Sequence, residues 1–243
     1  AKGMAYDSDE GRDYAASITA LMTGEAYKRS AELAAIKGCF NAFPHNREPM
    51  LEIIAKHIDK ISIERINHTP LPDANIWMDA NNTWCEAENI GYRYGYRNAQ
   101  VSLLAPTGTI SIMMDCDTTG CEPDSSLVRY KKLAGGGTIK HVNGVVTRAL
   151  KSLGYKEKTP SAFGLSIDDI KKSMNEGNIT GLAPAHLPVF DCAFPDSRGR
   201  SINWEGHVKM VAAVQPFLSG GISKTINMPQ ESTVEDIEKA YRM

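Results

Sequence analysis

The stretch Leu104-Ala105-Pro106-Thr107-Gly108-Thr109-Ile110-Ser111 places small hydroxyl residues and a glycine directly after an apolar run. Residues 100–105 predict a buried strand, and the residues after Ala105 predict a turn at its carboxyl end. Such a turn offers free backbone N–H groups, hydroxyls and a glycine that permits close approach, which an anionic phosphate requires. In α/β sheets and barrels, ligands gather at this end of the strands. The sequence therefore predicts an α/β fold with a phosphate-binding loop formed by Pro106, Thr107, Gly108, Thr109, Ile110 and Ser111.

Two other features leave alternatives open. Turns rich in Thr and Gly also connect strands to helices without binding any ligand. A second candidate for phosphate contact combines Lys131-Lys132, Gly135-Gly136-Gly137 and Lys140. For this second stretch, a glycine-rich surface loop flanked by solvated lysines is the favoured interpretation.

Composition restricts the class of protein without deciding its function. The chain has 243 residues, 42% hydrophobic and 23% charged, which is not the composition of a disordered protein. Its net charge of −2 provides no basic field, so we expect no nucleic acid polymer as a partner. No apolar run approaches the roughly 20 residues that a membrane span needs, and no signal peptide is apparent. We therefore expect a cytoplasmic protein without a membrane partner.

The five cysteines are scattered and odd in number, which favours reduced thiols over a disulfide framework. Cys116 and Cys121, with Asp115, Asp117 and His141, could in principle bind a metal. However, no second Cys or His pair stands at a spacing typical of zinc sites, so we expect no metal.

Periodic apolar residues and capping signals predict several helices. One helix begins at Asp7 or Ser8 and carries Ala15, Ile18, Leu21 and Met22, and a second covers residues 25–37 and ends at Gly38. Five further helices are predicted, one of which places two tryptophans in the core. These are residues from 48 onward, with Met50, Leu51, Ile54 and Ile58 on one side; 76–90, with Trp77 and Trp84; a helix capped by Ser166 and Asp169; 204–218; and 232–243, with a capping box from Ser232 to Glu235.

The remaining chain offers one further predicted strand and no established catalytic motif. Residues 222–227 have strand character, and residues 156–180 form a polar excursion. No Gly-x-Ser-x-Gly elbow, Walker loop or dinucleotide fingerprint occurs. The six histidines lack acidic or nucleophilic partners in the local sequence, so each is predicted to be structural. These are His45, His57, His68, His141, His186 and His207.

The longer string from Leu103 to Asp124, which includes the phosphate loop, closely resembles the vitamin-B12-dependent (class II) ribonucleotide reductases. Similar motifs follow in order along the chain. They are residues 6–12, 20–27, 46–50, 95–101, 130–133, 186–194, 213–220, 222–225 and 227–229.

The resemblance implies that residues 1–243 are the C-terminal portion of a single ten-stranded α/β barrel domain, truncated at both ends. It implies reduction of ribonucleotides, most naturally diphosphates, to 2′-deoxyribonucleotides by a thiyl radical that adenosylcobalamin generates. A ribonucleotide substrate, a thioredoxin-like reductant and a possible homodimer are the implied partners. Residues 106–110 match the loop that holds the substrate's phosphates in that family, and Thr107→Val or Thr109→Val is expected to raise the Michaelis constant.

The radical cysteine of the family lies in an Asn-x-Cys-x-Glu pattern, which surrounds none of the five cysteines here. No catalytic residue is therefore assigned, and that motif is expected upstream of Ala1. The chain also lacks an initiator methionine, which suggests a fragment. The alternative is a non-catalytic phosphate-binding or assembly module without the radical cysteine.

Overall fold

The computed structural model describes residues 2–67, 75–114, 116–132, 135–158, 165–175 and 180–243. Two compact units make up the chain. Unit 1 combines residues 1–11, 106–209 and 224–243, and unit 2 combines residues 12–105 and 210–223. The chain thus passes from unit 2 to unit 1 between Ala105 and Pro106, at the start of the predicted phosphate loop.

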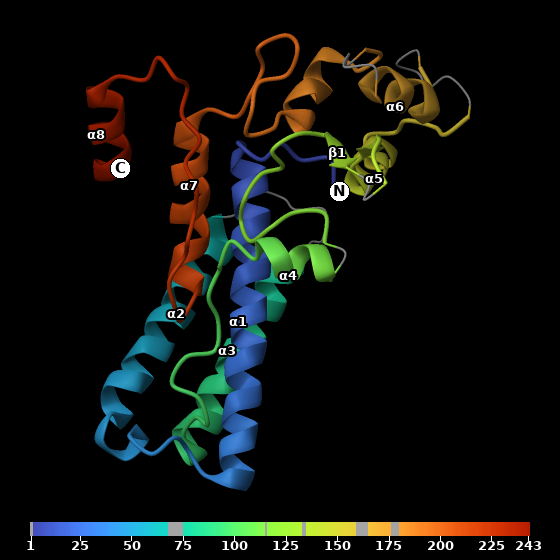
Figure 1. Cartoon of the computed structure of the whole chain (residues 1–243). Helices are drawn as coiled ribbons and strands as arrows, with labels where there is room; N and C mark the ends of the chain where they lie inside the picture. Colours follow the sequence, from blue (N-terminus) through green and yellow to red (C-terminus); the bar gives the residue numbers. More distant parts are fainter. Residues whose placement is uncertain (1, 68–74, 115, 133–134, 159–164, 176–179) are drawn as a thin grey trace. The chain divides into compact units, whose positions relative to one another are not determined.

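The elements of Figure 1 follow the chain in a mostly helical order. The α-helices are α1 (Asp9–Lys37), α2 (Arg47–Asn67), α3 (Ile76–Tyr94), α4 (Gly108–Met113), α5 (Gly144–Ser152), α6 (Ile167–Asn175), α7 (Trp204–Val214) and α8 (Val234–Arg242). Short 3₁₀ helices are η1 (Phe43–His45), η2 (Pro184–Phe190) and η3 (Gln215–Phe217). The two strands are β1 (Val128–Lys132) and β2 (Thr138–Val142).

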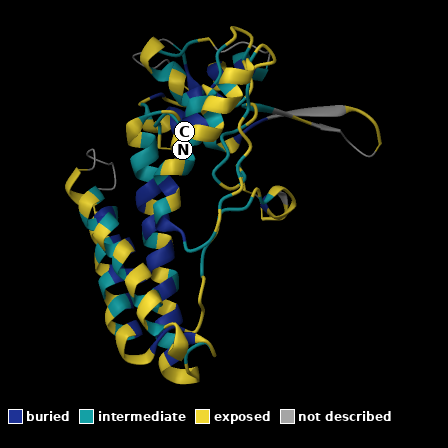
Figure 2. Ribbon diagram, turned by 90° about the vertical axis from the view of Figure 1, so that its left-hand side faces the viewer, coloured by how far each residue is buried: buried dark blue, intermediate teal, exposed yellow. Residues whose placement is uncertain are grey.

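Unit 2 is built on α1, α2 and α3, whose buried positions follow the inner sides of the helices (Figure 2). Trp77 and Trp84 are both buried, as the sequence predicts, and the Trp84 indole N–H donates to the Ala20 carbonyl at 2.8 Å. Ile54 of α2 joins the same core. The spacing of apolar residues in α2 and α3 therefore predicts their buried faces correctly.

Helix α1 differs from its prediction in two respects. It is one continuous helix from Asp9 to Lys37, so the predicted division before Glu25 is wrong. Gly24 lies inside it because a Cβ there would stand 2.6 Å from Cδ1 of Trp84, so close helix packing requires the glycine. Of the apolar residues at helical spacing, Leu21 packs against the core, whereas Ile18 and Met22 are exposed and small residues such as Ala20 are buried.

The ends of the helices show how local chemistry sets their boundaries. Ser8 accepts the Gly11 N–H at 3.0 Å and so caps α1, and Gly38 ends it with a positive φ of 80°. The predicted Ser166 and Asp169 pair caps α6 reciprocally, with Asp169 N–H donating to the Ser166 hydroxyl at 3.2 Å.

Two predicted helices have shifted limits. Helix α7 ends at Val214 instead of Leu218 because Pro216 cannot continue an α-helix, and η3 follows. In α8 the capping box joins Thr233 with Asp236, one residue later than the predicted Ser232 and Glu235. Both differences arise because neighbouring sequence positions offer competing breaking or capping residues.

The strands are fewer than an α/β barrel needs within the described residues. β1 and β2 form an antiparallel hairpin with Val128 opposite Val142, in unit 1. The predicted strands at 100–105 and 222–227 are extended but meet only at one parallel bridge, Leu104 with Ile222, in unit 2. Leu103 is exposed and its neighbours are half-buried, so residues 100–105 are not the buried strand predicted from the sequence. The ten-stranded barrel stays a prediction.

Unit 1 has its own apolar core, formed by β2, α5, α6 and η2. Its buried members include Val146, Leu150, Ile170 and Phe190. Asn143 caps α5 by accepting the Val145 N–H at 3.0 Å. Among the helices the structure describes, none is both long and apolar enough to cross a membrane.

Candidate functional site

Only Pro106 and Thr107 of the predicted phosphate loop precede α4, and Gly108 to Ser111 lie within its first turns. Pro106, Gly108 and Thr109 are exposed, and a Cβ placed on Gly108 would meet nothing within 4 Å. The first N–H groups of a helix have no partner inside it, so the opening turn of α4 presents donors beside this open backbone. The residues from Pro106 to Ile110 thus form one accessible segment, in which Thr107 is half-buried, and Ser111 after it is buried.

The hydroxyl groups of the loop divide into two kinds. The Thr107 hydroxyl accepts the Gly120 N–H at 3.1 Å and lies 2.8 Å from the hydroxyl of Ser111, which is buried. The Thr109 hydroxyl is exposed and has no hydrogen-bond partner in the part of the chain that the structure describes. Thr107 and Ser111 therefore support the loop, whereas Thr109 is available to a ligand.

Thr107 also has an unusual backbone conformation. Its φ is +42°, and it is the one residue other than glycine with a positive φ in the described ranges. This region is disfavoured for a β-branched residue, because Cβ crowds the backbone. Strain of this kind costs on the order of 1–3 kcal/mol and persists only where surrounding contacts impose it.

A tight turn of four residues, Thr119 to Glu122, faces the loop. The Glu122 N–H donates to the Thr119 carbonyl at 3.0 Å and closes this 119–122 turn. Gly120 has a φ of +52° and points its N–H at Thr107. On its other side, the turn receives the Tyr6 hydroxyl, which donates to the Cys121 carbonyl at 2.7 Å.

Glu122 belongs to a buried charge cluster. Its carboxylate is paired with the Lys224 ammonium, and the two side chains are 15% and 5% exposed. The second carboxylate oxygen accepts the Thr225 N–H at 2.8 Å. Lys224 also donates to His207 Nδ1 at 2.8 Å and to the Thr225 carbonyl at 2.7 Å. The three N–H bonds of the ammonium are therefore all satisfied.

This arrangement fixes the protonation of His207. Because Nδ1 accepts from an ammonium, the imidazole is neutral and carries its proton on Nε2. Burial, with a smaller contribution from Lys224, lowers the His207 pKa to about 4. The side chain is fully buried, and Nε2 has no hydrogen-bond partner among the described residues. Burial likewise raises the pKa of Tyr6, whose ring centroid lies 6.1 Å from that of His207.

The cluster was not visible in the sequence. The lysine partner of His207 lies 17 residues away in the sequence, and the glutamate that shares the lysine is still more distant. Only the tertiary structure brings Tyr6, Glu122, His207 and Lys224 together. The single signal in the sequence is that three of the four fall inside the motifs listed above.

The other candidate residues are placed as follows. Cys116 is exposed, Cys121 is half-buried with a pKa raised by burial, and all five cysteines are free thiols. Asp117 pairs with Arg148 at 2.7 Å. Asp115 and the side chain of His141 lie outside the described residues, and no group of three or more potential metal ligands occurs within them.

The second phosphate candidate forms the β1–β2 hairpin and its loop. Gly135, Gly136 and Gly137 are exposed in that loop, with nothing within 4 Å of a Cβ at any of them. The side chains of Lys131, Lys132 and Lys140 lie outside the described part of the chain. The backbone is therefore that of an open surface loop, and the solvated state of its lysines stays a prediction.

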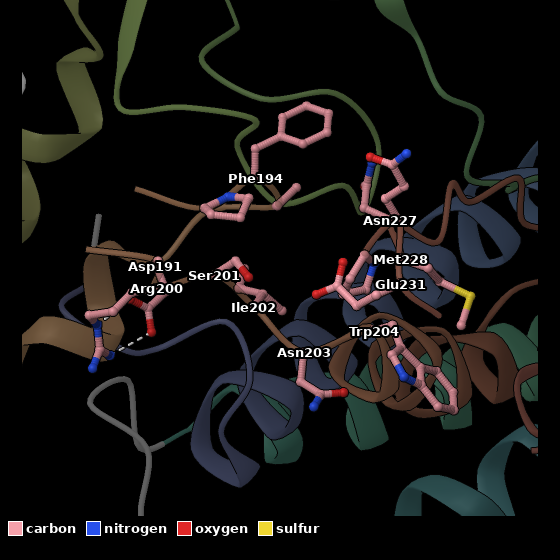
Figure 3. A pocket seen from close by; sticks show the side chains of 15 residues that line it. Asp191, Phe194, Arg200, Ser201, Ile202, Asn203, Trp204, Asn227, Met228 and Glu231 are labelled. Carbon is pink, nitrogen blue, oxygen red and sulfur yellow. Dashed lines mark hydrogen bonds and ion pairs between the residues drawn. The ribbon is translucent and has the colours of Figure 1, made fainter. Parts of the chain in front are cut away.

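A cavity of about 610 Å³ in unit 1 lies at the start of α7. Figure 3 shows Phe194, Asn227, Glu231 and Trp204 around it, with the Arg200–Asp191 ion pair to one side. Arg200 bonds both carboxylate oxygens of Asp191, at 3.0 and 2.7 Å. Because this neutralises the one cation in the described lining, the cavity does not offer a second phosphate site.

Comparison with known proteins gives a consistent result. The family model described as "Ribonucleotide reductase, barrel domain" matches residues 1–243. The "Vitamin B12-dependent ribonucleotide reductase" of Streptomyces coelicolor is 46% identical over 241 residues, which is 99% of this chain and 24% of the relative. The protein of the same name from Rhodopirellula baltica is 48% identical, covering 98% of this chain and 22% of the relative.

A more distant relative carries a more specific name. The "Vitamin B12-dependent ribonucleoside-diphosphate reductase" of Thermoplasma acidophilum is 31% identical over 150 residues, which is 60% of this chain and 17% of the relative. The chain thus spans about a quarter of the length of the first two relatives, or less. The family match over the whole sequence agrees with the resemblance found in the motifs, and the chain belongs to the ribonucleotide reductase barrel-domain family.

Proposed function

We propose that this chain forms the C-terminal portion of the single catalytic barrel domain of a vitamin-B12-dependent ribonucleotide reductase, and that Pro106 to Ser111 bind the substrate's phosphates. The observation that carries the site assignment is the open backbone at Gly108 with an exposed Thr109 hydroxyl in the first turn of α4. Exposed N–H donors and a hydroxyl are suited to a phosphate oxygen. Family membership supports the reaction, reduction of ribonucleotides to 2′-deoxyribonucleotides.

The substrate is proposed to be a ribonucleoside diphosphate. The name of the Thermoplasma acidophilum relative supports this choice. A thioredoxin-like reductant, a homodimer and a cytoplasmic location complete the proposal at the level of the complete enzyme. The ten-stranded α/β barrel is part of the same proposal, with the Leu104–Ile222 bridge as the point where its two predicted strands pair.

Adenosylcobalamin is the proposed radical generator of the complete enzyme. The larger cavities described within the two units have volumes of about 610 and 600 Å³. Clefts of about 300–1,000 Å³ suit drug-sized ligands, and a corrin with its nucleotide and adenosyl groups is considerably larger than such a ligand. Neither of these two cavities matches that size by itself, so the cofactor is proposed for the complete enzyme.

The test begins with the coding DNA on both sides of this segment. We expect an in-frame Asn-x-Cys-x-Glu pattern upstream and turnover of ribonucleoside diphosphate by the encoded protein only when adenosylcobalamin is added. Undiminished turnover without the cofactor would contradict the assigned class. Genuine start and stop codons bracketing the segment would instead favour the non-catalytic phosphate-binding module.

A further inference from the structure

Stability alone does not explain the buried ion pair between Lys224 and Glu122, because ion pairs in protein interiors do not by themselves stabilise a fold. Removing two charges from water is costly, and well-packed apolar residues of similar volume often stabilise a fold as well or better. Yet Lys224 is 5% exposed, Glu122 is 15% exposed, and each ammonium N–H has an acceptor. Because all its hydrogen bonds are made, the Lys224 ammonium holds its partners in one geometry. The segment that it holds through Glu122 indicates the role of the lysine.

That segment is the 119–122 turn. Each of its residues is fixed by a separate bond: Thr119 by the Glu122 N–H, Gly120 by Thr107, Cys121 by the Tyr6 hydroxyl, and Glu122 by Lys224 and Thr225. All of these residues belong to unit 1. The turn therefore connects the buried charge cluster on one side with the phosphate loop on the other.

The end of this connection is the strained residue of the loop. The Gly120 N–H holds the Thr107 hydroxyl, and Thr107 has the positive φ of 42°. Because a β-branched residue does not adopt this conformation unaided, the contacts around it must impose it. Among the described residues, the Thr107 hydroxyl has two hydrogen-bond partners, the Gly120 N–H and the Ser111 hydroxyl.

We propose that Lys224 is a positioning residue for substrate binding: by holding Glu122, it fixes the 119–122 turn, whose Gly120 N–H sets the conformation of the phosphate loop at Thr107. Lys224 itself does not touch the phosphate. The inference rests on the proposed function of the loop, since its consequence is tighter binding of nucleotide.

The experiment compares Lys224→Met with the unmodified protein in the complete reductase. KM for ribonucleotide should rise about 5-fold, the factor equivalent to loss of about 1 kcal/mol, or one ordinary hydrogen bond. A purely structural role would lower the amount of active enzyme and hence Vmax, but would leave KM unchanged. Hydrogen exchange of the peptide covering residues 117–122 should become faster without any nucleotide present.

Two further variants keep the test decisive. Lys224→Met leaves a buried carboxylate without its counter-charge, so the double variant Lys224→Met with Glu122→Gln removes both charges and should fold while still raising KM. Lys239→Met is the matched control, because Lys239 pairs with Glu205 in the same unit and is 61% exposed. It should leave both KM and the exchange of residues 117–122 unchanged.

The possible results separate this inference from the proposed function. If Thr109→Val raises KM but neither Lys224 variant does, the positioning role is wrong and the phosphate loop stands. If Thr109→Val leaves KM unchanged, the phosphate assignment fails. In that case, unchanged exchange of residues 117–122 in the Lys224 variants would also overturn the tie between Lys224 and the turn.

Discussion

Thr107 combines three constraints: a backbone φ of +42°, a hydrogen bond from the Gly120 N–H to its hydroxyl, and a contact of that hydroxyl with the buried Ser111 hydroxyl. Thr109, two residues later, has none of them. Sequence alone treats these threonines as equivalent, because both are hydroxyl residues in one short turn. The structure separates a threonine that shapes the loop from one that is free to bind. Replacing Thr107 should therefore disturb the conformation of the loop, whereas replacing Thr109 should remove a hydroxyl that is available to the phosphate.

His207 gives a prediction on pH. The imidazole pKa is about 6.5 in an unfolded chain and about 4 in this fold. Between these values the unfolded state binds more protons, so the free energy of unfolding falls as pH falls from 6.5 to 4. The loss from this group should total on the order of 3 kcal/mol at most, and should not continue below pH 4.

Urea unfolding of the chain at several pH values measures this effect. His207→Gln removes the titrating group while keeping a polar side chain of similar size, so its stability should depend less on pH over the same interval. Equal pH dependence in the two proteins would show that His207 does not titrate as its burial beside Lys224 requires.

At the scale of single elements, features set by residues close in sequence could be predicted, whereas features set by tertiary contacts could not. The helix capped by Ser166 and Asp169 and the buried Trp77 and Trp84 follow from spacing within a few residues. Helix α1 does not, because a glycine is locally a helix breaker and only its contact with Trp84 explains its place inside the helix. The exposure of Ile18 is equally invisible without the neighbours of α1.

Gly24→Ala tests the packing of α1 against α3. The added Cβ would lie 2.6 Å from Cδ1 and 2.7 Å from Nε1 of the buried Trp84. Although alanine is the better helix former, overpacking typically costs about 1–3 kcal/mol, so the chain should be destabilised. The matched control is Gly144→Ala in α5, where the nearest atom is 3.6 Å away and stability should be unchanged or slightly higher. A lower urea midpoint for the Gly24 variant alone is the expected result, and a gain in stability would contradict the packing described here.

At the scale of the whole molecule, ordered motifs along the chain predicted the family, and the match over residues 1–243 confirms it. The ten-stranded barrel stays a prediction. Its two predicted strands meet only at Leu104 and Ile222 among the residues described, and a sheet needs partners distant in sequence. The Lys224 cluster is likewise absent from any local pattern, since Glu122 and Lys224 are 102 residues apart in the sequence.

The loop from Pro106 to Ser111 is proposed to bind substrate phosphate, and the KM of Thr109→Val in the complete reductase tests this proposal most directly. Loss of one hydrogen bond to a charged phosphate costs about 1.5–3 kcal/mol, so KM should rise roughly 10-fold or more. Thr109→Ser keeps the hydroxyl and should remain close to the unmodified enzyme. A KM for Thr109→Val equal to that of the unmodified enzyme would contradict the claim.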